Sequence, residues 1–140
     1  MTLTGPSSVD SGVGMDERFV YFNANPKGLR TGDCVFRAMA YFRGVTWEKA
    51  VKDIVDFAVA RGLVSFNFIT TFSAFLKAEG FERHPVPRTG MTVGEFLEEF
   101  KDDSRCFFLS CTRHCTVIQG GKLIDTWPCF DRKVFAYWVR

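Results

Sequence analysis

Cys34 is the side chain of this sequence with the strongest case for acting as a nucleophile. A helix is predicted to begin at this cysteine and to end at Gly44, because the apolar residues between them recur at helical spacing: Val35, Ala38, Met39 and Phe42. Asp33 is the expected N-cap. A thiol in the first turn lies at the positive end of the helix dipole, beside backbone N–H groups without helical partners, and both favour the thiolate. A free cysteine is more often a packed, inert side chain, so the spacing alone leaves both roles open.

A thiolate nucleophile needs a base beside it, and histidine is the natural base near neutral pH. The sequence has two histidines. His84 precedes Pro85 in a predicted loop, where an exposed imidazole without a role is the ordinary expectation. His114 begins a β-prone segment and is therefore the candidate base.

The register of a predicted hairpin brings an aspartate to His114. If Gly120-Gly121 forms a two-residue turn, Trp127 lies opposite His114, and Asp125 is the diagonal neighbour on the same face. A carboxylate oxygen can then reach the imidazole and fix its orientation, while the indole excludes water from their contact. The alternatives are a histidine and an aspartate that do not meet on a solvated face, and a tryptophan that only packs in the core.

The order of these residues, a cysteine on an N-terminal helix followed by a histidine and a carboxylate on a later sheet, resembles that of papain-like cysteine peptidases. Asp125-Thr126-Trp127 is similar to the Asn-Ser-Trp of papain-type enzymes, in which the amide orients the histidine and the tryptophan covers their contact. Asp33-Cys34-Val35-Phe36-Arg37-Ala38 resembles the cysteine motif of ovarian-tumour-type deubiquitinases, although Thr31 stands where that motif has an acidic residue.

The resemblance is strongest to small papain-like proteins encoded by bacteriophages and prophages, over residues 21–139. It rests on these motifs: Asn23-Ala24-Asn25-Pro26, Gly32-Asp33-Cys34, His114 and Asp125-Thr126-Trp127. It implies a phage or viral hydrolase with a catalytic triad, in which Cys34 attacks a carbonyl, His114 serves as base and then acid, and Asp125 fixes the His114 tautomer. The substrate would be a host or viral protein or peptide, cleaved at a peptide, isopeptide or other amide bond, with no cofactor.

Papain-type enzymes also carry an oxyanion-hole glutamine a few residues before the cysteine, and residues 27–33 contain none. Asn23, Asn25 or the backbone N–H of Cys34 are the candidates to replace it. The missing glutamine keeps a second class open, in which the chain is a catalytically inactive papain-like binding module that acts as an inhibitor or adaptor of a host protein.

The elements that must position these residues follow from the same periodicities. Residues 1–17 are expected to form a flexible tail and residues 18–140 a single domain. Beyond the Cys34 helix, further helices are predicted from Thr46 to Gly62, from Phe66 to Ala78 with Phe68 among its core phenylalanines, and after a capping box at residues 92–95. Strands are predicted at 19–22, 106–110, 115–118, 123–127 and 134–139. Helices first and strands last indicate an α+β fold, papain-like in its N-terminal helices packed on a C-terminal antiparallel sheet.

The composition favours one globular domain and argues against several classes of partner. Hydrophobic residues make up 46% of the chain, the net charge is +2, and the charges form no long run, so neither nucleic acid nor an anionic membrane is an expected partner. Residues 1–16 lack the pattern of a signal peptide, and no apolar run is long enough to span a membrane. The five cysteines, an odd number, are expected as reduced thiols of a cytoplasmic protein. The oligomeric state is not predicted.

A zinc site is a third possibility, since four cysteines and a histidine occur in the second half of the chain: Cys106, Cys111, His114, Cys115 and Cys129. No Cys-x-x-Cys pair is present, and Cys111 and Cys115 are predicted to face away from His114. Buried thiols in the sheet, with no metal, are therefore the expectation.

Overall fold

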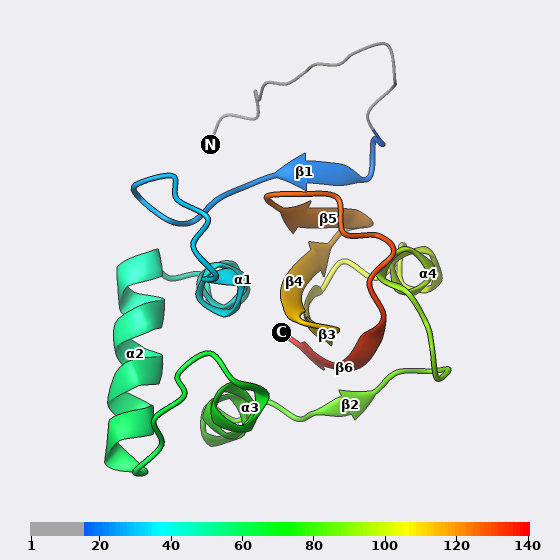
Figure 1. Ribbon diagram of the computed structural model, residues 1–140. Helices are drawn as coiled ribbons and strands as arrows, with labels where there is room; N and C mark the ends of the chain where they lie inside the picture. Colours follow the sequence, from blue (N-terminus) through cyan, green and yellow to red (C-terminus); the bar gives the residue numbers. More distant parts are fainter. Residues whose placement is uncertain (1–15) are drawn as a thin grey trace.

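The computed structural model describes residues 16–140, so residues 1–15 of the expected tail lie outside the described residues. Within that range the chain forms four helices and one six-stranded sheet, which confirms the α+β prediction. Figure 1 shows the first three helices on one side of the sheet and the fourth on the other. Two apolar cores result, one under each group of helices.

The helices form where apolar spacing and capping residues predict them. Their bounds are α1 Cys34–Arg43, α2 Trp47–Ala60, α3 Ile69–Ala78 and α4 Val93–Glu99. The apolar face predicted for α1 is buried, and Gly44 ends the helix in the left-handed conformation at φ +69°. Thr46 caps α2 through its side chain, and Thr92 with Glu95 forms the predicted capping box.

The prediction for the third helix was wrong at its start. The helix begins at Ile69 rather than Phe66, and the Phe68 side chain is 61% exposed instead of packed in the core. Phe68 is the N-cap residue, with an extended backbone, so its ring does not lie on the apolar face that Phe72 and Phe75 share. Helical spacing cannot distinguish the residue before a helix from one inside it.

The strands are β1 Phe19–Tyr21, β2 His84–Pro85, β3 Cys106–Cys111, β4 His114–Gln119, β5 Lys122–Asp125 and β6 Val134–Val139. The sheet order is β1-β5-β4-β3-β6-β2. Successive side chains of β3 point to opposite faces of the sheet and into different cores: Phe108 packs under α1 and α3, and Phe107 packs under α4. The sheet is thus buried on both faces.

The expectation of a purely antiparallel sheet was wrong, because β1 pairs with β5 in parallel and the sheet is mixed. No tight turn joins these two strands, so the sequence pattern leaves their relative direction unspecified. The hairpin register was right: Gln119 pairs with Lys122 across the Gly120-Gly121 turn. The strand expected to continue to Trp127 ends at Asp125. Helix α1 packs against this hairpin at β4, which fixes the place of the candidate site (Figure 1).

Candidate functional site

His114 and Asp125 form a buried hydrogen-bonded pair. Nε2 of His114 lies 2.7 Å from Oδ2 of Asp125, and the two residues are 8% and 6% exposed. His114 is the first residue of β4 and Asp125 the last of β5, so the hairpin register places them diagonally on one face. The structure therefore brings together the histidine and the carboxylate that the sequence paired.

The Asp125 carboxylate is held by several donors. Its Oδ1 accepts a hydrogen bond of 2.6 Å from the backbone N–H of Thr126, and its Oδ2 accepts one of 3.5 Å from the thiol of Cys129. Burial raises the pKa of Asp125, but the hydrogen bond and the charge of His114, with the other donors, lower the pKa below its ordinary value. Asp125 is thus an ionised, oriented acceptor.

Cys34 is the first residue of α1 and is only partly buried. Burial raises the pKa of its thiol, but hydrogen bonds from His114 and from the Cys115 backbone N–H, with the charges of His114 and Arg37, outweigh burial and lower the pKa. Since Nε2 of His114 is held by Asp125, Nδ1 is the ring nitrogen that remains available to the Cys34 thiol. The geometry therefore brings Cys34, His114 and Asp125 together.

The pKa of His114 is shifted in the opposite direction. Burial lowers it, but the hydrogen bond to Asp125 and those to Cys129 and Cys34 raise the pKa of His114 well above its usual range. A raised histidine pKa beside a lowered cysteine pKa favours a thiolate–imidazolium pair at neutral pH. The thiolate of such a pair can attack a carbonyl carbon, and the imidazolium can give its proton to the leaving group.

Trp127 lies against the imidazole. The centres of the two rings are 5.2 Å apart, with planes at 58°, and Trp127 is half-buried. The indole thus shields one side of the His114–Asp125 contact from water, which strengthens the hydrogen bond.

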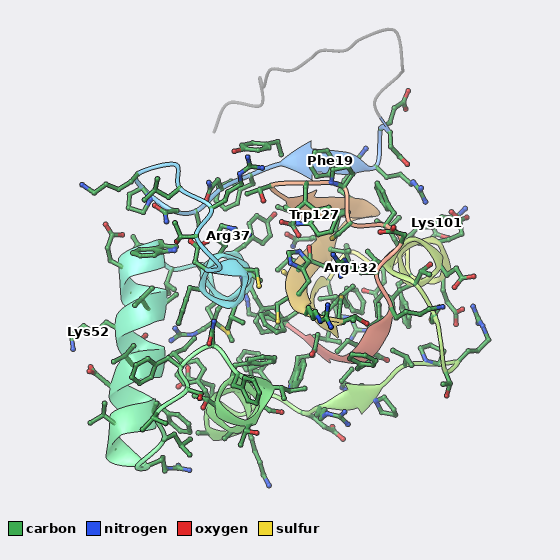
Figure 2. The ribbon with its side chains drawn as sticks, in the orientation of Figure 1. Phe19, Arg37, Lys52, Lys101, Trp127 and Arg132 are labelled. Carbon is green, nitrogen blue, oxygen red and sulfur yellow. The ribbon has the colours of Figure 1, made fainter. Side chains whose placement is uncertain are left out.

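Asp33 occupies the N-cap position of α1 but does not cap the helix with its side chain. Its buried carboxylate accepts hydrogen bonds from Asn25 Nδ2 at 3.1 Å and Trp47 Nε1 at 2.9 Å, and pairs with the Arg37 guanidinium. These donors and charges lower its pKa against the effect of burial, which raises it. The aspartate therefore ties the loop before Cys34 to α1 and α2, and Figure 2 shows Arg37 between these helices and β1.

The two asparagines proposed for an oxyanion hole hold the same loop. Asn23 Nδ2 donates to the Leu29 carbonyl at 3.1 Å, and the buried Asn25 amide donates to Asp33. As the first residue of α1, Cys34 has no intrahelical acceptor for its backbone N–H, and within residues 16–140 that group donates no other hydrogen bond. Of the three candidates, the Cys34 N–H has the fewest other partners among the described residues.

Cys129 belongs to this cluster, although a buried thiol in the sheet was the preferred expectation for it and a zinc ligand the alternative. Its sulfur, a ring nitrogen of His114 and a carboxylate oxygen of Asp125 all lie within 4.8 Å of one another, a grouping that can hold a metal ion. Burial, the largest influence, raises the pKa of Cys129 and keeps it a neutral thiol, which opposes metal binding. Cys129 lies beyond the end of β5, so no strand periodicity could have placed it.

The remaining predictions concern Cys111, Cys115 and His84, and their outcomes differ. Cys111 pairs directly with His114 across β3 and β4, so the prediction that it faces away was wrong; the Thr112-Arg113 turn sets this register. Cys115 packs in the opposite core, as expected. The prediction that His84 lies exposed in a loop was wrong: it belongs to β2 at the edge of the sheet, is half-buried, and stacks on Tyr137 with ring centres 5.0 Å apart.

A small cavity borders Cys34, and a larger hollow borders the residues just before it. A cavity of about 10 Å³, room for about one water molecule, lies between α1 and the hairpin, and Cys34, Thr116 and Asp125 are among its lining residues. A larger hollow of about 550 Å³ lies beside Gly32 and Asp33 and is bounded by α2 and by residues 64–67. The second is large enough to take part of a peptide.

Within residues 16–140, no helix is both long and apolar enough to cross a membrane. No family model, curated protein or solved structure matches this chain.

Proposed function

We propose that this protein is a cysteine-dependent hydrolase with a papain-like arrangement of its site, which cleaves a peptide, isopeptide or other amide bond by acyl transfer. The observation that carries the proposal is a thiol with a lowered pKa at the start of α1, beside a buried His114–Asp125 pair. Three separate segments supply these groups: the start of α1, the start of β4 and the end of β5. That convergence is what acyl transfer requires.

In the proposed reaction the Cys34 thiolate attacks the substrate carbonyl and the His114 imidazolium protonates the leaving amine. A thioester with Cys34 remains. His114, now neutral, takes a proton from water, the hydroxide attacks the thioester, and the thiol is released. Asp125 holds Nε2 throughout, so that Nδ1 always faces the reacting sulfur.

The negative charge that develops on the carbonyl oxygen needs a donor, and the backbone N–H of Cys34 is the one we propose. It belongs to the first turn of a ten-residue helix, where the helix dipole also favours negative charge. Asn23 and Asn25 are proposed to position the loop instead.

The proposed substrate is a protein or peptide, since the hollow beside Asp33 offers room for a chain segment on the acyl side of the scissile bond. We further propose that the protein is encoded by a bacteriophage or prophage and that it acts on host or viral protein in the host cytoplasm.

Labelling of Cys34 tests the proposal. Wild type, Cys34→Ala and His114→Ala are treated with an electrophilic thiol reagent at about pH 6, and labelled sites are identified by mass spectrometry. We expect Cys34 to react on the order of tenfold faster than Cys106, whose pKa is raised by burial, and to slow without His114. Equal rates for the two cysteines, or no effect of His114→Ala, would contradict an activated nucleophile.

A binding module is the second candidate, and the apolar surface of α3 and the segment before it favours it. Val64 is 86% exposed and Phe68 61% exposed, which is costly unless something covers them. If Cys34→Ala preserves the biological effect of the protein while Phe68→Asp abolishes it, binding rather than catalysis is its role.

A further inference from the structure

A cationic side chain lies over the tryptophan that covers His114. The guanidinium carbon of Arg132 is 5.2 Å from the centre of the Trp127 ring, and that ring is 5.2 Å from the imidazole. Figure 2 shows Arg132 and Trp127 near one another in the region between α1 and α4. Arg132 is half-buried, so it places a positive charge in the wall of the candidate site.

Most hydrogen-bond donors of Arg132 are unused within residues 16–140. Its Nη1 donates a long hydrogen bond of 3.4 Å to the Thr112 carbonyl, in the turn that leads to His114. No carboxylate among the described residues pairs with it, and neither Nε nor Nη2 has a partner there. An arginine fork with two free donors matches the geometry of a carboxylate.

A second cation, Arg113, follows Thr112 in the turn that leads to His114. Arg113 is exposed and adopts φ +52°, the one positive φ of a residue other than glycine in the part of the chain that the structure describes. A positive φ is what a two-residue hairpin turn requires, so the turn fixes the backbone of Arg113. Arg113 directly precedes His114 in the chain and Arg132 lies over Trp127, so both cations belong to segments at the His114 end of the site.

The proposed reaction determines which part of the substrate lies at the His114 end of the site. His114 must protonate the departing amine, so the amine lies on the imidazole side of Cys34. Trp127 and Arg132 belong to that side, whereas the hollow beside Asp33 borders α1 and α2.

We propose that Arg132, assisted by Arg113, binds a carboxylate in the part of the substrate that leaves with the amine. The carboxylate belongs either to an acidic side chain or to the free C-terminus of the released peptide. As a statement about substrate this rests on the proposed function, but the charge at the site can be measured without turnover.

The measurement compares alkylation of Cys34 by iodoacetate and by iodoacetamide, which differ by one negative charge. The ratio of the iodoacetate rate to the iodoacetamide rate is expected to fall about threefold in Arg132→Gln and to be retained in Arg132→Lys, because the positive charge over Trp127 is removed in the first variant and kept in the second. Lys52→Gln, on the far side of α2 in Figure 2, is the control of equal charge and should leave the ratio unchanged.

Two outcomes would overturn the inference. An unchanged ratio in Arg132→Gln means that the charge does not act at the site. Equal slowing with both reagents means that Arg132 only holds Trp127 in place. A slow reaction of wild-type Cys34 with iodoacetamide would instead count against the proposed function.

Digestion of a mixed peptide library separates the two carboxylate sources. Acidic residues enriched just after the cleavage sites indicate a side chain, and cleavage confined to the last few residues indicates a terminal carboxylate. Either preference should disappear in Arg132→Gln. Cleavage without any carboxylate preference would refute the inference and leave the proposed hydrolase standing, and where no peptide is cleaved the alkylation ratio alone decides.

Discussion

Trp47 Nε1 donates a hydrogen bond of 2.9 Å to Oδ2 of Asp33, which joins the first residue of α2 to the residue before Cys34. The residue before Cys34 is thus a buried carboxylate that is tied to α2. The position of Cys34 is set by the loop network around Asp33 as much as by the helix that follows.

Removing that carboxylate should destabilise the protein. Asp33→Ala leaves the Arg37 guanidinium buried without its partner, at an expected cost of about 3 kcal/mol in the free energy of unfolding. Trp47→Phe removes one hydrogen bond and should cost about 1 kcal/mol. Urea unfolding measures both, with Asp56→Ala as the control, because the ion pair of Asp56 with Lys52 is exposed and should contribute little. Similar values for Asp33→Ala and Asp56→Ala would disprove the role of the network.

His114→Ala should be destabilising in a pH-dependent way. It leaves Asp125 buried and unpaired, at an expected cost of about 3 kcal/mol near neutral pH. In wild type the pKa of Asp125 is lowered, so its contribution is present above its ordinary pKa of 3.8 and is lost as the pH falls through the lowered folded value. Without His114 the folded pKa of Asp125 should rise, so the deficit of the variant should shrink toward low pH. A deficit that is constant with pH would argue against an ionised Asp125.

The alkylation rate of Cys34 should persist at low pH. Because its pKa is lowered, the thiolate should remain populated below the range of an ordinary thiol, and the rate–pH profile should lie at lower pH than that of a cysteine peptide. In His114→Ala the profile should move to higher pH, since the main partner that lowers the pKa is gone. Rates measured between about pH 5 and pH 9 test this, and coincident profiles would contradict it.

Cys129→Val and Cys129→Ser should differ. The serine keeps a donor to Asp125, whereas the valine removes it and leaves Oδ2 with His114 alone. We expect Cys129→Val to slow Cys34 alkylation at about pH 6 by two- to fivefold, and Cys129→Ser to slow it less. If both variants slow the reaction equally, packing rather than the hydrogen bond to Asp125 is what Cys129 provides.

The parts of this molecule that follow from local pattern could be predicted. The spacing of Val35, Ala38 and Met39 defines the buried face of α1, and Gly120-Gly121 sets the register that pairs His114 with Asp125. In each case the deciding contacts lie within a few residues along the chain or across one tight turn.

What could not be predicted depends on contacts between distant segments. Asp33 looks like a helix cap, but Trp47 and Asn25 draw its carboxylate away from the helix N-terminus. Cys129 meets His114 only because the chain turns back after β5, outside any strand periodicity. Strand β1 pairs in parallel with β5, which is distant in the sequence, so no local pattern sets its direction. Capping and spacing rules describe one element at a time, so they do not predict contacts with distant segments.

The parallel pairing of β1 with β5 protects the strand that carries Asp125. Tyr21 pairs with Asp125, and the Phe22 N–H donates to the Asp125 carbonyl at 2.9 Å. Without β1, β5 would be an open edge with unsatisfied backbone groups, a template for pairing with another chain. A truncation that begins after Phe22 should therefore both loosen the Asp125 carboxylate and promote aggregation.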